Sequence, residues 1–373
     1  MDVTEIVHFI KLTNPNIDFD LVCTFYYDET NNVKKFHLKA GDFNTVFHSD
    51  FILGGLAYFG ERPDINDIFS GLDLQPNVTE VKLKHIATNG FEDCLRSTKL
   101  TTFLNYLLRS ALYLHYSSLN LLYYSLVDIV DSAIHYSKPA MQLGMQFSAM
   151  LKTNLYIICQ REIDIVTDLF FRYKYPNIEE KDVPGFIDEL VALIEKYEDE
   201  EELHVGLVSL RQILQQARKA NSLPFIMDET DHMLISGFTA FYMRPVYTFA
   251  RSTHYFDAEA DIQNEFANDD IILNGQVLHN YHFLDSKADR LTQASDVIVG
   301  LIGKFSKFIN THTIEELEQL IGGMNAQQQT NLDLYLDLVL KSERVNPGFF
   351  HSTTSFTDKS KEQFLFFLRG KSL

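Results

Sequence analysis

The chain has 373 residues, of which 46% are hydrophobic and 22% charged, and this length suits about two globular domains. Such a composition excludes a collagen, a disordered tail and a disulfide miniprotein. The formal net charge of -19 disfavours unspecific attraction to nucleic acid or to an anionic membrane, so a nucleic-acid partner must be held locally. The three cysteines lie far apart without a CxxC pair, which fits a reducing cytoplasm and indicates no disulfide framework.

The negative charge is concentrated in two segments. Residues 176–202 carry eleven acidic residues and two lysines, a net charge of -9, and residues 257–270 carry six acidic residues and no base. The rest of the chain sums to only -4, so it is compatible with a substrate that bears phosphates. We interpret both segments as solvated acidic surface.

The first predicted elements are strands. Residues 18–29, 34–38 and 51–59 are rich in aromatic and β-branched residues and are separated by turn signals, which favours a three-stranded antiparallel meander. Residues 78–86 fit either an extended segment or the start of a helix. From residue 100 the pattern predicts a helix, a strand at 111–116 and a second helix at 119–134.

The second half of the chain is mainly helical. Residues 140–220 show helical spacing throughout, and predicted strands follow at 223–229 and 281–287. A helix is predicted at 288–309, and amphipathic helices are predicted in the tail beyond residue 310. The start of the chain lacks the basic-then-apolar order of a signal peptide and no apolar run is long enough to span a bilayer, so we expect a soluble, cytoplasmic protein.

Four acidic residues stand at the end of an apolar strand or inside an apolar helix, where a charge is costly unless it is paired or binds a cation. They are Asp28, Glu80, Asp228 and Asp296. Carboxylates that converge from separate elements suit magnesium or manganese, and two such ions can activate water for attack on a phosphodiester. Each acid taken alone is better explained by a helix cap, a turn or an ion pair, and the recurrence of the pattern is what favours a cation site.

The start of the predicted helix 288–309 offers a further candidate. Asp289 and Asp296 are seven residues apart and therefore face the same way. Lys287 precedes the helix, where its ammonium group could meet a phosphate. A capping box of Ser286 with Asp289 is an alternative that needs no catalysis.

The order of several short motifs resembles the ribonuclease H-like family catalogued as domain of unknown function thirty-eight hundred. The motifs are DET at residues 28–30, FILGGLA at 51–57, EVK at 80–82, an apolar run ending in DE at 228–229, and DSK at 285–287 followed by LTQASD at 291–296. The family's Ser-Gly after the first acids is Thr30-Asn31 here, and Ser295 stands at the small position before the final acid. The resemblance covers residues 18–310 except the helical block 140–220.

The resemblance implies a role for each matching residue. It implies Asp28 as the ligand that bridges two magnesium or manganese ions, Asp296 as the ligand from the final helix, and Glu80 and Asp228 as flanking ligands. Of the neighbours Asp228 and Glu229, which face opposite sides of a strand, we choose Asp228. Lys82 and Lys287 are the implied phosphate contacts.

Other sites are less well supported. His279 and His282 fall on opposite faces of an extended segment, which disfavours zinc. His232 is a candidate proton shuttle or an ordinary loop histidine. No phosphate loop, dinucleotide fingerprint, nucleophile elbow or HExxH motif occurs, so an ATPase acting in the same pathway would be a separate protein.

The sequence therefore predicts an α/β protein with a ribonuclease H-like mixed sheet, a large helical insertion and a helical C-terminal extension. The expected domains are 1–139 with 221–310, then 140–220, and 311–373. The expected activity is that of a two-metal nuclease on DNA or RNA, with prokaryotic anti-phage defence as the implied setting. The alternative is a non-catalytic interaction or regulatory protein. Self-association and a further protein partner stay open, and no membrane partner is expected.

Overall fold

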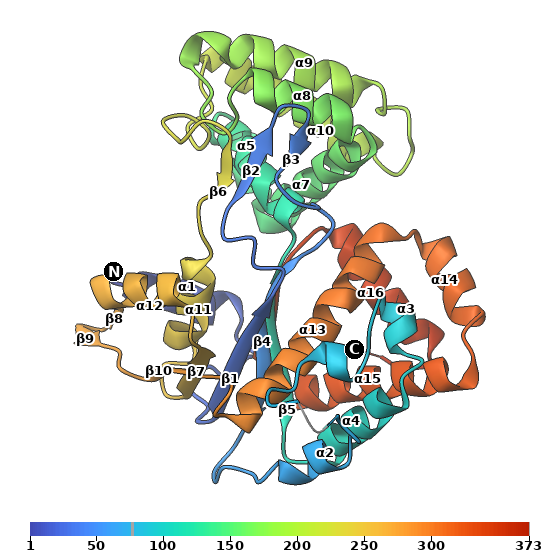
Figure 1. Cartoon of the computed structure of the whole chain (residues 1–373). Coiled ribbons are helices and arrows are strands. Elements are labelled where there is room, and N and C mark those ends of the chain that lie inside the picture. Colours follow the sequence, from blue (N-terminus) through green and yellow to red (C-terminus); the bar gives the residue numbers. More distant parts are fainter. Residues whose placement is uncertain (76–77, 373) are drawn as a thin grey trace.

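A six-stranded mixed sheet organises the computed structural model, which describes residues 1–75 and 78–372 (Figure 1). The strands follow the order β10-β7-β1-β4-β5-β11 across the sheet. Their bounds are Thr24–Thr30 (β1), Phe51–Tyr58 (β4), Tyr113–Leu119 (β5), Thr253–Asp257 (β7), Tyr281–Leu284 (β10) and Phe350–Thr353 (β11). β1, β4 and β5 are antiparallel neighbours, β7 and β10 continue the sheet in parallel with β1, and β11 pairs in parallel with β5. The chain is thus an α/β protein with a mixed sheet.

The predicted meander is correct in its first and last strands but wrong in the middle one. Residues 36–39 form β2 (Phe36–Lys39), which pairs with β3 (Asp42–Phe43) and β6 (Met233–Ile235) in a separate three-stranded sheet. Asn31 and Lys34 both have a φ of 58°, in the left-handed region, and these residues turn the chain away from the main sheet after β1. The third strand of the meander is β5, in the segment where the sequence predicts a strand.

Helices cover both faces of the main sheet (Figure 1). One face packs against α13 (Arg290–Thr311), and α4 (Thr98–Arg109) and α15 (Ala326–Val345) pack on one another in the same hydrophobic core. The other face packs in a second core with α5 (Leu121–His135) and α11 (Thr239–Thr248). Successive residues of a strand face opposite sides, so Phe25 and Tyr27 enter one core and Tyr26 the other.

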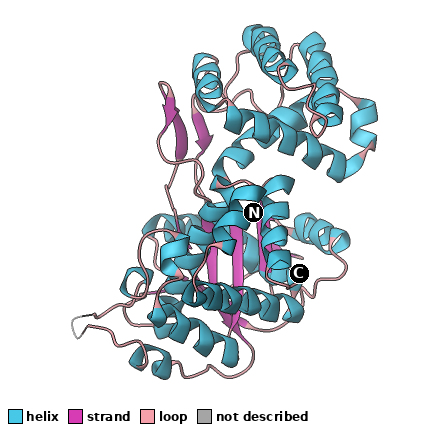
Figure 2. Cartoon of the chain, turned by 90° about the vertical axis from the view of Figure 1, so that its right-hand side faces the viewer, coloured by secondary structure: helices cyan, strands magenta, loops and turns pink. Residues whose placement is uncertain are grey.

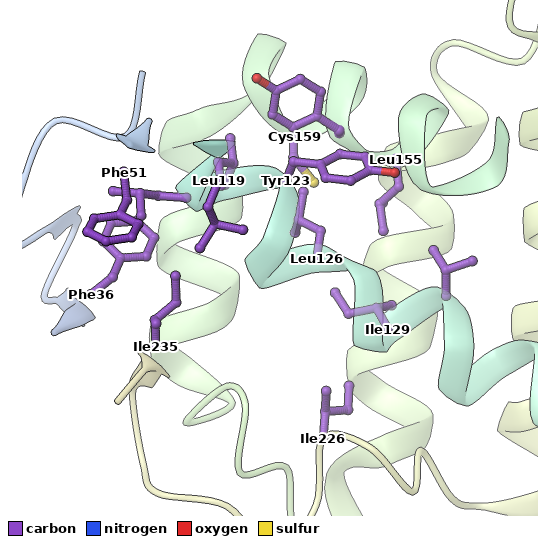
Figure 3. Close-up of a cluster of buried hydrophobic side chains, with 14 of the residues drawn as sticks. Phe36, Phe51, Leu119, Tyr123, Leu126, Ile129, Leu155, Cys159, Ile226 and Ile235 are labelled. Carbon is purple, nitrogen blue, oxygen red and sulfur yellow. The ribbon is translucent and has the colours of Figure 1, made fainter. Parts of the chain in front are cut away.

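Residues 138–220 form helices that stand beyond one end of the main sheet, as the spacing of their apolar residues predicts (Figure 2). They are α6 (Lys138–Gln142), α7 (Gly144–Arg161), α8 (Ile163–Arg172), the short helix η2 (Glu180–Asp182), α9 (Val183–Glu195) and α10 (His204–Ala220). Phe36, Phe51 and Ile235 lie in the same buried cluster as Leu126 of α5 and Leu155 of α7 (Figure 3). The helical block and the sheet therefore share a continuous core.

The remaining elements frame these two parts. They are α1 (Thr4–Thr13), α2 (Asn66–Ser70), η1 (Leu83–His85), α3 (Phe91–Cys94), α12 (Ala260–Asn268), β8 (Ile272–Leu273), β9 (Gln276–Val277), α14 (Ile314–Gly322), η3 (Pro347–Phe349) and α16 (Phe356–Leu368). Within residues 1–75 and 78–372, no helix has both the length and the apolar character needed to cross a membrane.

Candidate functional site

A close contact between α13 and the centre of the sheet sets the position of Asp296. The Ser295 hydroxyl accepts a hydrogen bond from the backbone N–H of Leu56, at 3.2 Å, and donates one to the Tyr26 carbonyl, at 3.4 Å. A Cβ at Gly55 would lie 2.5 Å from Ser295 Oγ and would overlap the Tyr26 carbonyl, so glycine is what lets the helix approach this closely. These contacts fix the rotation of α13 and place the next residue, Asp296, beside β1.

Asp28 and Asp257 stand side by side at the ends of two parallel strands. β1 and β7 pair with Tyr26 opposite Tyr255. Asp28 follows Tyr26 by two residues and Asp257 follows Tyr255 by two, so both carboxylates project from the face that carries the two tyrosines. Tyr26 belongs to the core formed with α13. Asp28 and Asp257 therefore face the helix that carries Asp296.

Ser286 and Lys82 attach Glu80 to this group. The Ser286 hydroxyl donates to Glu80 Oε1 at 3.1 Å, while the Ser286 backbone N–H donates to Asp257 Oδ1 at 3.2 Å. The ammonium group of Lys82 lies 3.1 Å from Glu80 Oε1 and 3.8 Å from Asp296 Oδ2. One serine and one lysine thus connect carboxylates that come from a loop, a strand and a helix.

Burial and neighbouring negative charges raise the pKa values of Asp28 and Asp296. Burial, followed by the negative charges of Asp296, Glu29 and Asp257, raises the pKa of Asp28 well above its usual range. The side chain of Asp28 is only 7% exposed, and it accepts a hydrogen bond from the Glu29 backbone N–H at 2.7 Å. Burial also raises the pKa of Asp296, although the nearby Lys82 ammonium opposes the shift. Neighbouring carboxylates with raised pKa values are typical of functional sites, including cation sites that hold no cation.

The chemistry of the donor set fits a hard divalent cation. Asp28, Glu80, Asp257 and Asp296 offer carboxylate oxygens alone, which magnesium and manganese prefer, and no thiolate or imidazole. Within the described ranges, no three acidic, histidine or cysteine side chains are close enough together to hold an ion as they stand. Lys82 supplies the positive charge between two of the four acids. Metal binding at this site would therefore require the carboxylates to draw together and Lys82 to move aside.

Asp228 does not belong to this group, and the predicted strand at 223–229 is wrong. These residues form turns and bends beside the helical block, and Asp228 is exposed with a φ of 63°. The neighbouring Glu229 donates its backbone N–H to Asn177 of the same region. The strand-ending acid next to Asp28 is instead Asp257, within a segment that the charge pattern had indicated as solvated surface. Its signal in the sequence was the run Thr253–Asp257, in which aromatic residues lead to a single acid just as they do before Asp28.

Of the two candidate residues at the start of α13, Asp289 has a structural role and Lys287 is free of side-chain ion pairs in the described residues. Asp289 is the N-cap of α13, accepting hydrogen bonds from the backbone N–H groups of Leu291 and Thr292, and it pairs with Arg62 at 2.8 Å. The predicted capping box of Ser286 with Asp289 is therefore wrong in its residues, because Asp289 itself caps the helix and the Ser286 hydroxyl bonds Glu80. Lys287 is exposed, and its backbone N–H donates to Asp285. Its predicted phosphate contact stays a prediction.

The candidate histidine at position 232 lies away from the carboxylates. His232 stacks on Phe171 of the helical block, with ring centroids 4.5 Å apart. His282, on β10, stacks on Tyr255 with ring centroids 5.1 Å apart.

Comparisons with known protein families, with curated proteins and with solved structures give no match for this chain. Any function must therefore be argued from the site itself.

Proposed function

We propose that this chain is a nuclease of ribonuclease H-like fold that depends on magnesium or manganese and hydrolyses phosphodiester bonds of DNA or RNA. The observation that carries the proposal is the convergence of Asp28, Asp257, Asp296 and Glu80 on the face of the sheet covered by α13. Buried acids are costly to keep charged, so their gathering in one place favours a cation as their partner.

The topology supports the fold part of the proposal. Three antiparallel strands, β1, β4 and β5, are followed by β7 and β10 in parallel on the free side of β1. A helix, α13, then crosses the face that carries Asp28. This arrangement agrees with the opening meander, strand-ending aspartate and final helix expected from the family resemblance, with Asp257 in the place first given to Asp228.

Each residue of the group has a definite task in this proposal. Asp28 is the central ligand, because it is the most buried of the four and has acids on two sides. Asp257 and Asp296 flank it, and Glu80 completes the set through Ser286. Two bound divalent ions would supply water activation and charge stabilisation at the phosphate. Lys82, once released from Glu80 and Asp296, could pair with a phosphate oxygen.

The test is cleavage of fluorescein-labelled single- and double-stranded DNA and RNA with manganese or magnesium. The variants D28N, D257N and D296N keep the shape of each side chain but remove its charge. Since metal ions contribute several kcal/mol to such reactions, each variant should lose about 100-fold or more in rate. The matched control is D228N, which alters an exposed acid of the helical block and should cleave like the wild type.

Two outcomes would overturn the proposal. One is the absence of cation-dependent cleavage of all four substrates by the wild type. The other is full activity in D28N and D296N, since the proposed chemistry cannot proceed without these two ligands. If D228N loses its cleavage activity while D257N stays active, Asp228 and not Asp257 is the third aspartate ligand.

A further inference from the structure

A groove of about 500 Å³ opens beside Asp296, between the segment around η1, the end of β1 and α13. Four lysines line it. Lys82 and Lys84 come from the first wall, and Lys304 and Lys307 come from α13. The acids that line it are Asp296 and Glu29. The groove therefore has more basic than acidic residues, although the whole chain has a net charge of -19.

Most of this positive charge is available to a ligand. Within residues 1–75 and 78–372, Lys82 is the one lysine of the four that forms ion pairs. Lys84 and Lys307 are exposed, and the half-buried Lys304 donates a hydrogen bond to the carbonyl of Asn89. Elsewhere lysines are commonly paired, as Lys34 is with Asp261. A row of unpaired lysines next to a carboxylate site is suited to an extended anion.

Lys307 lies on the side of α13 that carries Asp296, and Lys304 lines the groove beside this stripe. Residues 296, 300, 303 and 307 are spaced by four, three and four, so they form one stripe along the helix. Asp296 and Lys307 are eleven residues apart, which is about 16 Å along the axis. A nucleic-acid strand that rises about 3.4 Å per nucleotide passes about five nucleotides over this length. The stripe thus leads from the candidate catalytic carboxylates to a basic end.

The walls of the groove indicate how a strand would be bound. The side chains that face it are polar or aliphatic, such as Thr88 and Leu83, and none of the described residues that line it is aromatic. Bases that stack on protein need aromatic side chains, whereas phosphates need only lysine, arginine or backbone N–H groups. Binding here would therefore be independent of base sequence and sensitive to salt.

We infer that this groove holds the phosphate backbone of a nucleic-acid strand on one side of the cleaved bond, with Lys84, Lys304 and Lys307 as the phosphate contacts. The inference rests on the proposed nuclease function, because the carboxylates define where the strand is cut. It adds the path of the substrate and the mode of recognition. The expected substrate is a strand several nucleotides long, bound without sequence preference.

The binding test uses K84A/K307A, which removes two exposed lysines of the groove. The control is K138A/K219A, which removes two exposed lysines of the helical block. Anisotropy of fluorescein-labelled dT20 and rU20 is measured in EDTA, so that no cleavage occurs, between 50 and 200 mM NaCl. Each lost contact to a single strand lowers the slope of log K against log salt by about 0.7, so K84A/K307A should lose about 1.4. The control should keep the slope of the wild type.

The cleavage test compares a small diester with an oligonucleotide. The wild type should hydrolyse bis(p-nitrophenyl) phosphate with manganese, and the control K138A/K219A should hydrolyse both this small diester and dT20 at the wild-type rate. K84A/K307A should show a raised KM for the labelled dT20, because the strand loses two phosphate contacts in the groove. An unchanged KM for dT20 would contradict the inference.

The outcomes separate the two proposals. Equal salt slopes in the two double variants would overturn the inference that the groove binds a strand, even if the protein proves to be a nuclease. A reduced slope in K84A/K307A, with neither diester hydrolysed by the wild type, would overturn the nuclease and leave a strand-binding groove. Equally tight binding of a polyglutamate peptide, lost in the same variant, would assign the groove to acidic protein and overturn the inference.

Discussion

The carboxylate group predicts that divalent cations stabilise the folded protein. Without a cation, Asp28 is held in a buried place beside Asp257 and Asp296, and its pKa is raised for that reason. A carboxyl with a raised pKa contributes stability at low pH, and that contribution is lost as the pH rises through the folded-state pKa. A bound cation acts in the opposite direction, because it favours the ionised form. Stabilisation by manganese should therefore grow as the pH rises.

The size of the effect follows from the length of the chain. An unfolding entropy of about 2.1 cal/mol/K per residue gives about 0.8 kcal/mol/K for 373 residues. One cation at a hundred times its Kd adds about 2.7 kcal/mol, which corresponds to about 3 °C in Tm. Two sites of equal affinity give about 7 °C. Because this stabilisation keeps growing with the logarithm of the free cation concentration, the slope of Tm against that logarithm reports the number of ions.

Differential scanning fluorimetry at pH 6, 7 and 8, with manganese titrated from micromolar to 10 mM, measures this shift. D28N should have a higher Tm than the wild type without metal, because the charge that burial disfavours is gone, and it should lose the response to manganese. D228N should respond like the wild type, since that acid is exposed in the helical block. A Tm that does not rise in 10 mM manganese at pH 8, or an undiminished rise in D28N, would refute the reasoning.

Two further predictions concern the frame of the site. In G55A a Cβ would collide with Ser295 and with the Tyr26 carbonyl, so it should unfold in urea with a loss of at least about 2 kcal/mol; G237A, where a Cβ meets nothing within 4 Å, should be nearly neutral. Burial and the charge of Glu259 raise the pKa of Glu29 from 4.5 to about 7. The wild type therefore loses stability as the pH rises toward 8, and E29Q should be more stable there by about 3 kcal/mol, with almost no difference at pH 4. A difference between E29Q and wild type that does not change with pH would contradict this account.

Three members of the carboxylate group, Asp28, Glu80 and Asp296, are predicted from the sequence, and two of them lie in elements with a strong local signal. Asp28 follows a run of aromatic residues that forms the central strand β1, and Asp296 lies in a long helix with strong apolar spacing. The place of Asp228 could not be predicted in this way. Its apolar run is short and follows Pro224, and whether such a run becomes a strand depends on a neighbour with free backbone groups. The free side of β1 is occupied by β7 instead.

The misplaced middle strand of the meander has the same cause. In β2 the alternating Phe36 and Leu38 are buried, as they would be in the main sheet. Alternation identifies a strand and its buried face but not the strand with which it pairs. Here β2 pairs with β6, from a segment about 200 residues later in the chain, and the two help to cover the helical block.

Residues of the DET and EVK motifs allow the acids of this site to lie near one another without a metal. Four carboxylates on one face repel one another, and the fold reduces that repulsion in two reversible ways. The raised pKa of Asp28 favours a bound proton there, and Lys82, two residues after Glu80, places its ammonium group between Glu80 and Asp296. Under the proposed function, a divalent cation would displace both the proton and the ammonium group. The same motif would then provide a ligand from Glu80 and a phosphate contact from Lys82.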